Sequence, residues 1–223
     1  MLAIIPTINR SSLLDPLLET LLGDGVRVVI VDGSNDRHPT VPNVHRIYAK
    51  WNIYKTWNYG LDLGKVQGDS SVFVLNDDIV LKPGSLIEMD AVVRKSGLDV
   101  VSFFDQSRRS HLRFEALFGT HTLCRRSTPD NSVRGHELCG YAFAVNPSTC
   151  PRFDEEFFWW CGDDDMFYRA EHRGHGIGIA CWLNVEHPKA SASSDDLDSV
   201  LPYGWKAHDF HRLDMQTIGL IDE

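Results

Sequence analysis

The sequence predicts an α/β fold in which helices flank a mostly parallel, doubly wound sheet. Through the first hundred residues, short apolar segments rich in valine and isoleucine alternate with segments whose apolar residues recur at helical spacing. This alternation is typical of consecutive β-α-β units with right-handed crossovers. A chain of 223 residues without an internal repeat is long enough for one well-buried domain of this kind.

The central strand of this sheet is predicted at Val72–Leu75, where four consecutive apolar residues indicate burial on both faces. Asn76, Asp77 and Asp78 follow directly, at the carboxyl end of the strand, where open α/β sheets bind their ligands. Two adjacent carboxylates suit a hard divalent cation, which in turn suits a diphosphate. The alternative is a plain turn in which Asp78 caps the next helix.

The other elements follow from the same patterns. Apolar, β-leaning segments predict strands at Leu2–Pro6, Val26–Val31, Val44–Ala49, Val100–Phe104, Gly140–Val145, Ile177–Ala180 and Trp182–Val185. Helical spacing predicts helices over residues 13–22, around residues 53–61, after Pro83 and around Trp205–Leu213. The arginine-rich, aperiodic segment Asp105–Glu137 is predicted to be a mobile lid or an acceptor-facing loop. The alternative is a solvated excursion with a short helix around Leu112–Phe118.

The totals exclude several classes of protein. A net charge of −9 argues against non-specific binding of nucleic acid, and an anionic ligand needs a local positive centre from arginines or a bound metal. No apolar run approaches the roughly 20 residues of a membrane span, and the first six residues do not form a signal peptide. The five cysteines form no C-x-x-C pair, so reduced thiols in a cytoplasmic protein are expected.

A second acidic cluster, Asp163-Asp164-Asp165, stands at a predicted helix start behind the aromatic run Phe157–Trp160. Acids at this position complement the helix dipole, and capping alone is the alternative interpretation. Three acids exceed what capping needs, and aromatic neighbours would raise the pKa of one carboxylate toward the range of a general base. His187 follows the last predicted strand, although a lone histidine more often has a structural role.

Polar clusters thus recur at strand ends, and in their order the chain resembles a family 2-type glycosyltransferase of the GT-A, nucleotide-diphospho-sugar transferase-like fold. The matching segments are Ile4–Arg10, Val28–Asp36, Asn58–Gly60, Leu75–Ile79, Gly140–Val145, Phe153–Phe157, Gly162–Met166 with Arg169, and Val185–His187. The resemblance implies a catalytic domain over residues 1–190. Residues 191–223 are expected to form a C-terminal extension that packs on this domain.

The resemblance also implies roles for individual residues. The nucleotide would be bound by Thr7, Arg10, Asp32, Ser34, Asn58, Asn76 and Asp77. Asp78 and His187 would bind Mn²⁺ or Mg²⁺, since mixed carboxylate and imidazole ligands suit these ions. The general base would be Asp164, with its neighbour Asp163 as the alternative, because the motif reads Gly-Asp-Asp-Asp where Gly-Glu-Asp is common. The acceptor or the sugar would contact Trp159, Trp160 and Asp165.

The implied activity is metal-dependent transfer of a sugar, of the hexosyltransferase type, from a UDP-sugar to an acceptor hydroxyl with inversion. The acceptor class stays open: a glycan, a lipid-linked sugar, a protein side chain and a modified nucleobase all present hydroxyls. A nucleotidyltransferase is one alternative, but it would have a glycine-rich phosphate loop after the first strand, and Pro6–Arg10 contains no glycine. A non-catalytic sugar-nucleotide-binding module is the other, but it has no need of Asp163–Asp165.

Overall fold

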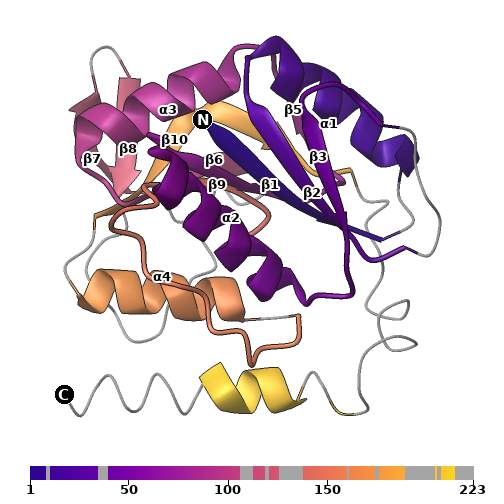
Figure 1. Ribbon diagram of the computed structural model, residues 1–223. Helices are drawn as coiled ribbons and strands as arrows, with labels where there is room; N and C mark the ends of the chain where they lie inside the picture. Colours follow the sequence, from indigo (N-terminus) through magenta and orange to yellow (C-terminus); the bar gives the residue numbers. More distant parts are fainter. Residues whose placement is uncertain are drawn as a thin grey trace.

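The computed structural model describes residues 1–8, 11–34, 40–105, 113–118, 121–125, 138–159, 161–173, 176–188, 204 and 207–213. In these residues a single sheet runs through the molecule, and helices cover both of its faces (Figure 1). The predicted α/β fold with helices on the two sides of a central sheet is therefore confirmed.

Within the described residues the sheet has ten strands. They are β1 (Leu2–Thr7), β2 (Arg27–Asp32), β3 (Val44–Tyr48), β4 (Val72–Leu75), β5 (Val80–Leu81), β6 (Val100–Asp105), β7 (Arg113–Phe118), β8 (His121–Arg125), β9 (Ala142–Val145) and β10 (Ile177–Glu186). Their order is β3-β2-β1-β4-β9-β6-β10-β8-β7, and β5 pairs with the end of β10.

The sheet is mixed, so the prediction of a mostly parallel sheet is corrected. Strands β1 to β4 are parallel to one another, and β6 is parallel to β10. Strand β9 runs antiparallel to both of its neighbours, β4 and β6, and β8 runs antiparallel to β10 and to β7. An unbroken apolar run indicates that a strand is buried on both faces. A central strand between two helix layers is buried in this way whether it is parallel or antiparallel to its neighbours, so the apolar pattern does not reveal its direction.

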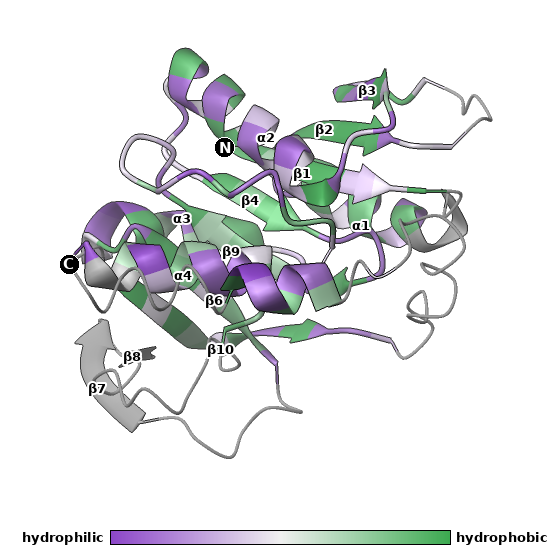
Figure 2. Ribbon diagram, turned by 90° about the horizontal axis from the view of Figure 1, so that it is seen from below, coloured by the Kyte–Doolittle hydropathy of each residue, from purple (hydrophilic) through white to green (hydrophobic). Residues whose placement is uncertain are grey.

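Four helices form the two outer layers. Helices α1 (Ser11–Gly23) and α3 (Ser85–Ser96) pack on one face of the sheet, and α2 (Ile53–Gln67) and α4 (Gly162–His172) pack on the other. Figure 2 looks onto the second face and shows the apolar strands, in green, behind these two helices. Each layer closes a separate apolar core, because strand side chains alternate between the two faces.

Helix α2 lies unusually close to the sheet because two of its residues are glycines. A Cβ at Gly60 would come within 2.6 Å of the Ile4 Cβ, and a Cβ at Gly64 within 2.3 Å of the Val72 Cγ2. The helix begins where the Asn52 side chain accepts a hydrogen bond from the Lys55 amide, and it ends at a left-handed glycine. The glycine of the Asn58–Gly60 motif thus serves the packing of α2 on β1.

Several local predictions differ from the structure. The short helix considered around Leu112–Phe118 is wrong, because residues 113–118 form β7 and pair with β8. The two strands predicted after Ile177 are one strand, β10, with an irregularity between Ala180 and Asn184. Cys181 is disulfide-bonded, so the expectation of five reduced thiols is wrong for this residue. The remainder of the predicted lid, residues 106–112, 119–120 and 126–137, lies outside the described residues.

The C-terminal region contributes a helical segment at 207–213, drawn in yellow at the foot of Figure 1. Leu213 is buried and belongs to the same apolar core as α2 and α4. The described part of the extension therefore packs on the rest of the fold. Across the described residues, no helix combines the length and the apolar character that crossing a bilayer requires.

Candidate active site

One edge of the sheet collects most of the predicted site residues. Strands β1 to β4, β6 and β10 all point the same way, so their carboxyl ends meet at this edge. Strand β9 runs in the opposite direction, so its amino end lies at the same edge, and Gly140 and Tyr141 directly precede it. The arrangement brings together polar groups from five strand ends: Thr7, Asp32, Asn76–Asp78, Asp105 and His187.

At the end of β2, the carboxylate of Asp32 is 1% exposed and fully engaged. One oxygen accepts a hydrogen bond of 2.9 Å from the Ser34 amide, and the other pairs with Arg46 on the neighbouring strand β3. Burial alone would raise the pKa of Asp32, but these hydrogen bonds outweigh it and hold the pKa below the ordinary value. Sequence reasoning did not single out Arg46, because it is a lone arginine in a half-exposed strand.

Between β1 and β4, Thr7 donates a hydrogen bond of 2.6 Å from its hydroxyl to a carboxylate oxygen of Asp77. Both side chains are buried. The pairing of Leu2 with Val72 sets the register of the two strands and brings their ends together. Thr7 and Asp77 therefore form one polar unit beside Asp32, the residue of β2 that pairs with Thr7.

The candidate metal ligands Asp78 and His187 lie side by side. The Nε2 atom of His187 is 3.1 Å from an Asp78 oxygen, yet this buried nitrogen makes no aligned hydrogen bond to it. Two ligands about 2.1 Å from an octahedral cation and at right angles to each other lie about 3 Å apart, so this spacing fits a shared divalent ion. Nearby, the buried side-chain oxygen of Asn76 has no hydrogen-bond partner among the described residues.

No three His, Cys, Asp or Glu side chains of the described residues form a complete metal cage. Asp78 and His187 would supply two ligands, and diphosphate oxygens and water would have to supply the others. This division is typical of ions that are bound together with a phosphate-bearing substrate. The residues present thus fit a cation that accompanies the ligand.

Tyr141, at the start of β9, holds His187 in place. Its ring stacks on the imidazole with centroids 4.3 Å apart and planes inclined by 20°. Its hydroxyl donates a hydrogen bond to Asp105 at the end of β6. Burial first, and then the neighbouring Cys139 and Asp105, raise the pKa of Tyr141 far above its ordinary value, so the phenol keeps its proton. Tyr141 was not predicted as a site residue.

The three acids of α4 occupy its first turn, as predicted, but they have different surroundings. Asp163 packs against Gly140: a Cβ on that glycine would lie 1.6 Å from an Asp163 oxygen. Asp165 is 1% exposed and receives two hydrogen bonds, of 3.0 and 2.6 Å, from Arg169. Burial raises the pKa of Asp165, although Arg169 acts in the opposite direction. This ion pair favours a structural role for Asp165 over contact with a sugar.

The turn that enters α4 is strained and firmly held. Cys161 has a positive φ of 66°, which is uncommon for a residue with a side chain. The Tyr54 hydroxyl donates a hydrogen bond of 2.6 Å to the Trp159 carbonyl and accepts one of 3.0 Å from the Gly162 amide. The tyrosine thereby bridges both ends of the turn. Gly162 is required here, because a Cβ would lie 2.4 Å from the ring of Tyr54.

Some predicted residues lie elsewhere or outside the described chain. Asn58 is buried in α2, and its amide exchanges hydrogen bonds of 2.9 Å with both backbone groups of Phe153, which favours a packing role over nucleotide binding. Trp159 is half-buried beside the entrance of α4. Arg10 and Trp160 lie outside the described residues.

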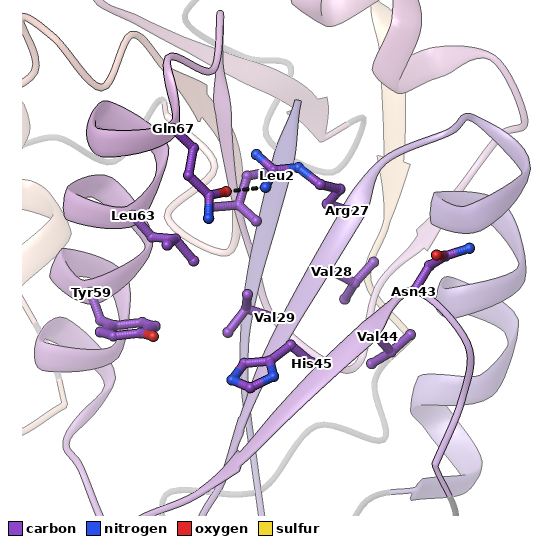
Figure 3. Close-up of a pocket in the computed structure, with 10 residues that line it drawn as sticks. All are labelled: Leu2, Arg27, Val28, Val29, Asn43, Val44, His45, Tyr59, Leu63 and Gln67. Atoms are coloured by element: carbon purple, nitrogen blue, oxygen red, sulfur yellow. Dashed lines mark hydrogen bonds between the residues drawn. The ribbon is translucent and has the colours of Figure 1, made fainter.

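A groove of about 490 Å³ lies at the opposite end of the sheet (Figure 3). It is bounded by the first residues of β1, β2 and β3 and by the side of α2 that faces them, with Leu2, Val44 and Leu63 among its apolar lining. Arg27 crosses its rim to bond Gln67. The groove contains none of the strand-end residues described above, so it is not part of the candidate site.

Two crystal structures of S. aureus TarS, residues 1–349, resemble this fold, and one of them is in complex with UDP. They align over 82% and 89% of this chain with TM-scores of 0.55 and 0.53. The chain therefore shares the fold of this TarS fragment. Sequence identity is 15% and 16%, so the likeness concerns the fold alone, and the alignments cover 58% and 62% of the TarS chains. No protein-family model and no curated protein matches the sequence.

Proposed function

We propose that this chain is a metal-dependent, inverting glycosyltransferase of family 2 type that transfers a hexosyl group from a UDP-sugar to an acceptor hydroxyl. The observation that carries the proposal is the pair Asp78 and His187 at one sheet edge, with Asp163 against the neighbouring Gly140. The glycosyltransferase-like fold, shared with a TarS fragment that binds UDP, supports this assignment.

The donor nucleoside would lie over the ends of β1, β2 and β4. Asp32 is kept ionised by Arg46 and the Ser34 amide, and its buried carboxylate would fix these two groups beside the nucleoside. Thr7 and Asp77 form the adjacent polar unit and would face the ribose. These groups are held before any ligand arrives, which limits the entropy lost on binding.

The diphosphate would lie toward Asp78 and His187. A protein with a net charge of −9 needs a local positive centre to accept it. Asp78 and His187 would hold Mn²⁺ or Mg²⁺, which when bound would supply that charge and stabilise the leaving diphosphate. Tyr141 keeps the His187 ring at the required orientation through stacking.

Asp163 is the better placed general base. Its carboxylate contacts Gly140, the residue before Tyr141. Because successive side chains on a helix point about 100° apart, Asp164 points away from this contact. Asp163 takes the proton of the acceptor hydroxyl while the new bond to the anomeric carbon forms and the bond to the diphosphate breaks. A single displacement of this kind inverts the anomeric centre.

The test is turnover of a panel of UDP-sugars by the purified chain with Mn²⁺, followed by mass spectrometry of released UDP and of glycosylated acceptors. We expect turnover with Mn²⁺ and none after chelation. Asp163→Asn should lower kcat by about 10²-fold or more while UDP affinity stays the same, with Asp164→Asn as the matched control. If the chain binds UDP but cleaves none of the UDP-sugars, the protein is a binding module and not a transferase. Full activity of Asp163→Asn would move the base elsewhere.

A further inference from the structure

The C-terminal segment 207–213 is fastened to the chain that leads into α4. Asp209 is 0% exposed, and its two carboxylate oxygens accept hydrogen bonds of 2.9 Å from the backbone amides of Phe158 and Trp159. The preceding His208 packs its ring 4.8 Å from that of Phe158. Bonds from backbone amides to an ionised carboxylate are stronger than neutral ones, so this is a firm attachment.

Arg212 makes a second attachment one helical turn further on. Two of its nitrogens bond an Asp154 oxygen at 2.8 and 2.5 Å, and a third lies 2.6 Å from Glu156. The guanidinium also sits 5.6 Å from the centre of the Phe157 ring. Residues 154–159 form neither helix nor strand, so their conformation depends on contacts of this kind.

The fastened stretch ends at the strained turn before the acids of α4. Trp159 is two residues from Cys161, whose positive φ persists only if the surroundings enforce it. Tyr54 holds the turn from the side of α2, and Asp209 holds the residues just before it from the C-terminal side. This turn at Cys161 determines where α4 begins, and the start of α4 determines where the Asp163 carboxylate lies.

We propose that Asp209 is a positioning residue for sugar transfer and that 207–213 is a clasp that fixes residues 154–159 and 161–162 in the reactive arrangement. This inference rests on the proposed function, because the arrangement it fixes is that of the general base. A catalytic group misplaced by about 1 Å can lose about 10²-fold in rate. The C-terminal extension would then belong to the active site rather than only to the packing of the domain.

The test compares Asp209→Asn with Asp24→Asn. Asp24 is a matched control: it is also buried and accepts two backbone hydrogen bonds, from Gly84 and Leu86, but it caps α3 on the other face of the sheet. We expect Asp209→Asn to lower kcat at least tenfold with KM for the UDP-sugar within twofold of the parent. Asp24→Asn should keep kcat within twofold. Equal kcat losses in both variants, or none in Asp209→Asn, overturn the proposal.

Hydrogen exchange of the peptide spanning 154–162 tests the clasp without any catalysis. Exchange should be faster in Asp209→Asn than in the parent and unchanged in Asp24→Asn, and unchanged exchange in both refutes the clasp. If the parent transfers no sugar, the proposed function fails and this measurement still decides whether the clasp exists. If Asp209→Asn does not fold, Arg212→Gln takes its place, and kcat and exchange equal to those of the parent would refute the proposal.

Discussion

Replacing Gly140 by alanine moves the Asp163 carboxylate without touching its chemistry. The added Cβ would lie 1.6 Å from one Asp163 oxygen, whereas an ordinary contact begins at 3.4 Å, so the carboxylate must retreat by about 1.8 Å. Gly140 is not among the glycines with positive φ, so alanine adds no backbone strain. A short side chain can retreat by rotating off its rotamer, at a cost of about 0.5–1.5 kcal/mol.

The expected result is a large loss of rate with a small loss of stability. A displacement beyond 1 Å should lower kcat by about 10²-fold, because the base no longer reaches the acceptor proton. KM for the UDP-sugar should stay within about twofold of the parent, since the donor groups on β1, β2 and β4 are unaffected. Steady-state release of UDP and a thermal unfolding curve measure the two effects.

Two further glycines serve as controls. Alanine at Gly23, the last residue of α1, meets no atom within 4 Å, so it should leave the rate unchanged and should not lower the stability. The Cβ of alanine at position 64 would lie 2.3 Å from Val72 in the core, so this variant should have a free energy of unfolding lower by about 1–3 kcal/mol. Its kcat, measured below its melting temperature, should equal that of the parent. A Gly140→Ala enzyme with the kcat of the parent would refute the placement of the base at Asp163.

Three other predictions concern the binding groups. His187→Ala should weaken Mn²⁺ binding in the presence of UDP by at least tenfold, measured by calorimetry, because Asp78 alone would remain as a protein ligand. Tyr141→Leu should weaken the same Mn²⁺ binding by about 10-fold or more and Tyr141→Phe by less, since phenylalanine keeps the stacking on His187. Asp32→Asn should lower the free energy of unfolding in urea at pH 7. Because the pKa of Asp32 is depressed in the folded state, the difference in the free energy of unfolding between parent and variant should have its full size above a pH of about 4 and should decrease as the pH falls further. A difference that does not change with pH would contradict the role of Arg46.

The candidate site could be predicted in part because strand ends are local features of a sequence. An apolar run that stops at Asn76-Asp77-Asp78 or at Asp32 shows where a buried strand gives way to polar groups. The parallel order of β1 to β4 follows from the β-α-β alternation, and the structure confirms it. The helix start at Asp163 was likewise predictable, because acids in the first turn are favoured by the dipole.

The neighbours of these residues could not be predicted, because each contact joins segments that are far apart in the chain. Arg46 reaches Asp32 only because β3 pairs beside β2, and Asp209 reaches Trp159 across 50 residues of sequence. Neither residue belongs to a pattern that periodicity or motif spacing detects. The partners of Asn58 and Asp165 could not be predicted either, since the Phe153 carbonyl and Arg169 reach them only through the tertiary fold and the helix geometry.

By itself, the sequence determined the α/β class, the strand ends that carry polar groups and the acidic start of α4, because each depends on residues within one short segment. Only the tertiary structure decided which of those groups meet. The pairing of Val80 with Glu186 places Asp78 beside His187, and the reversed direction of β9 brings Gly140 to the edge where Asp163 packs on it. Strand pairing and strand direction are settled by the burial of whole faces of the sheet, which no local pattern of residues encodes.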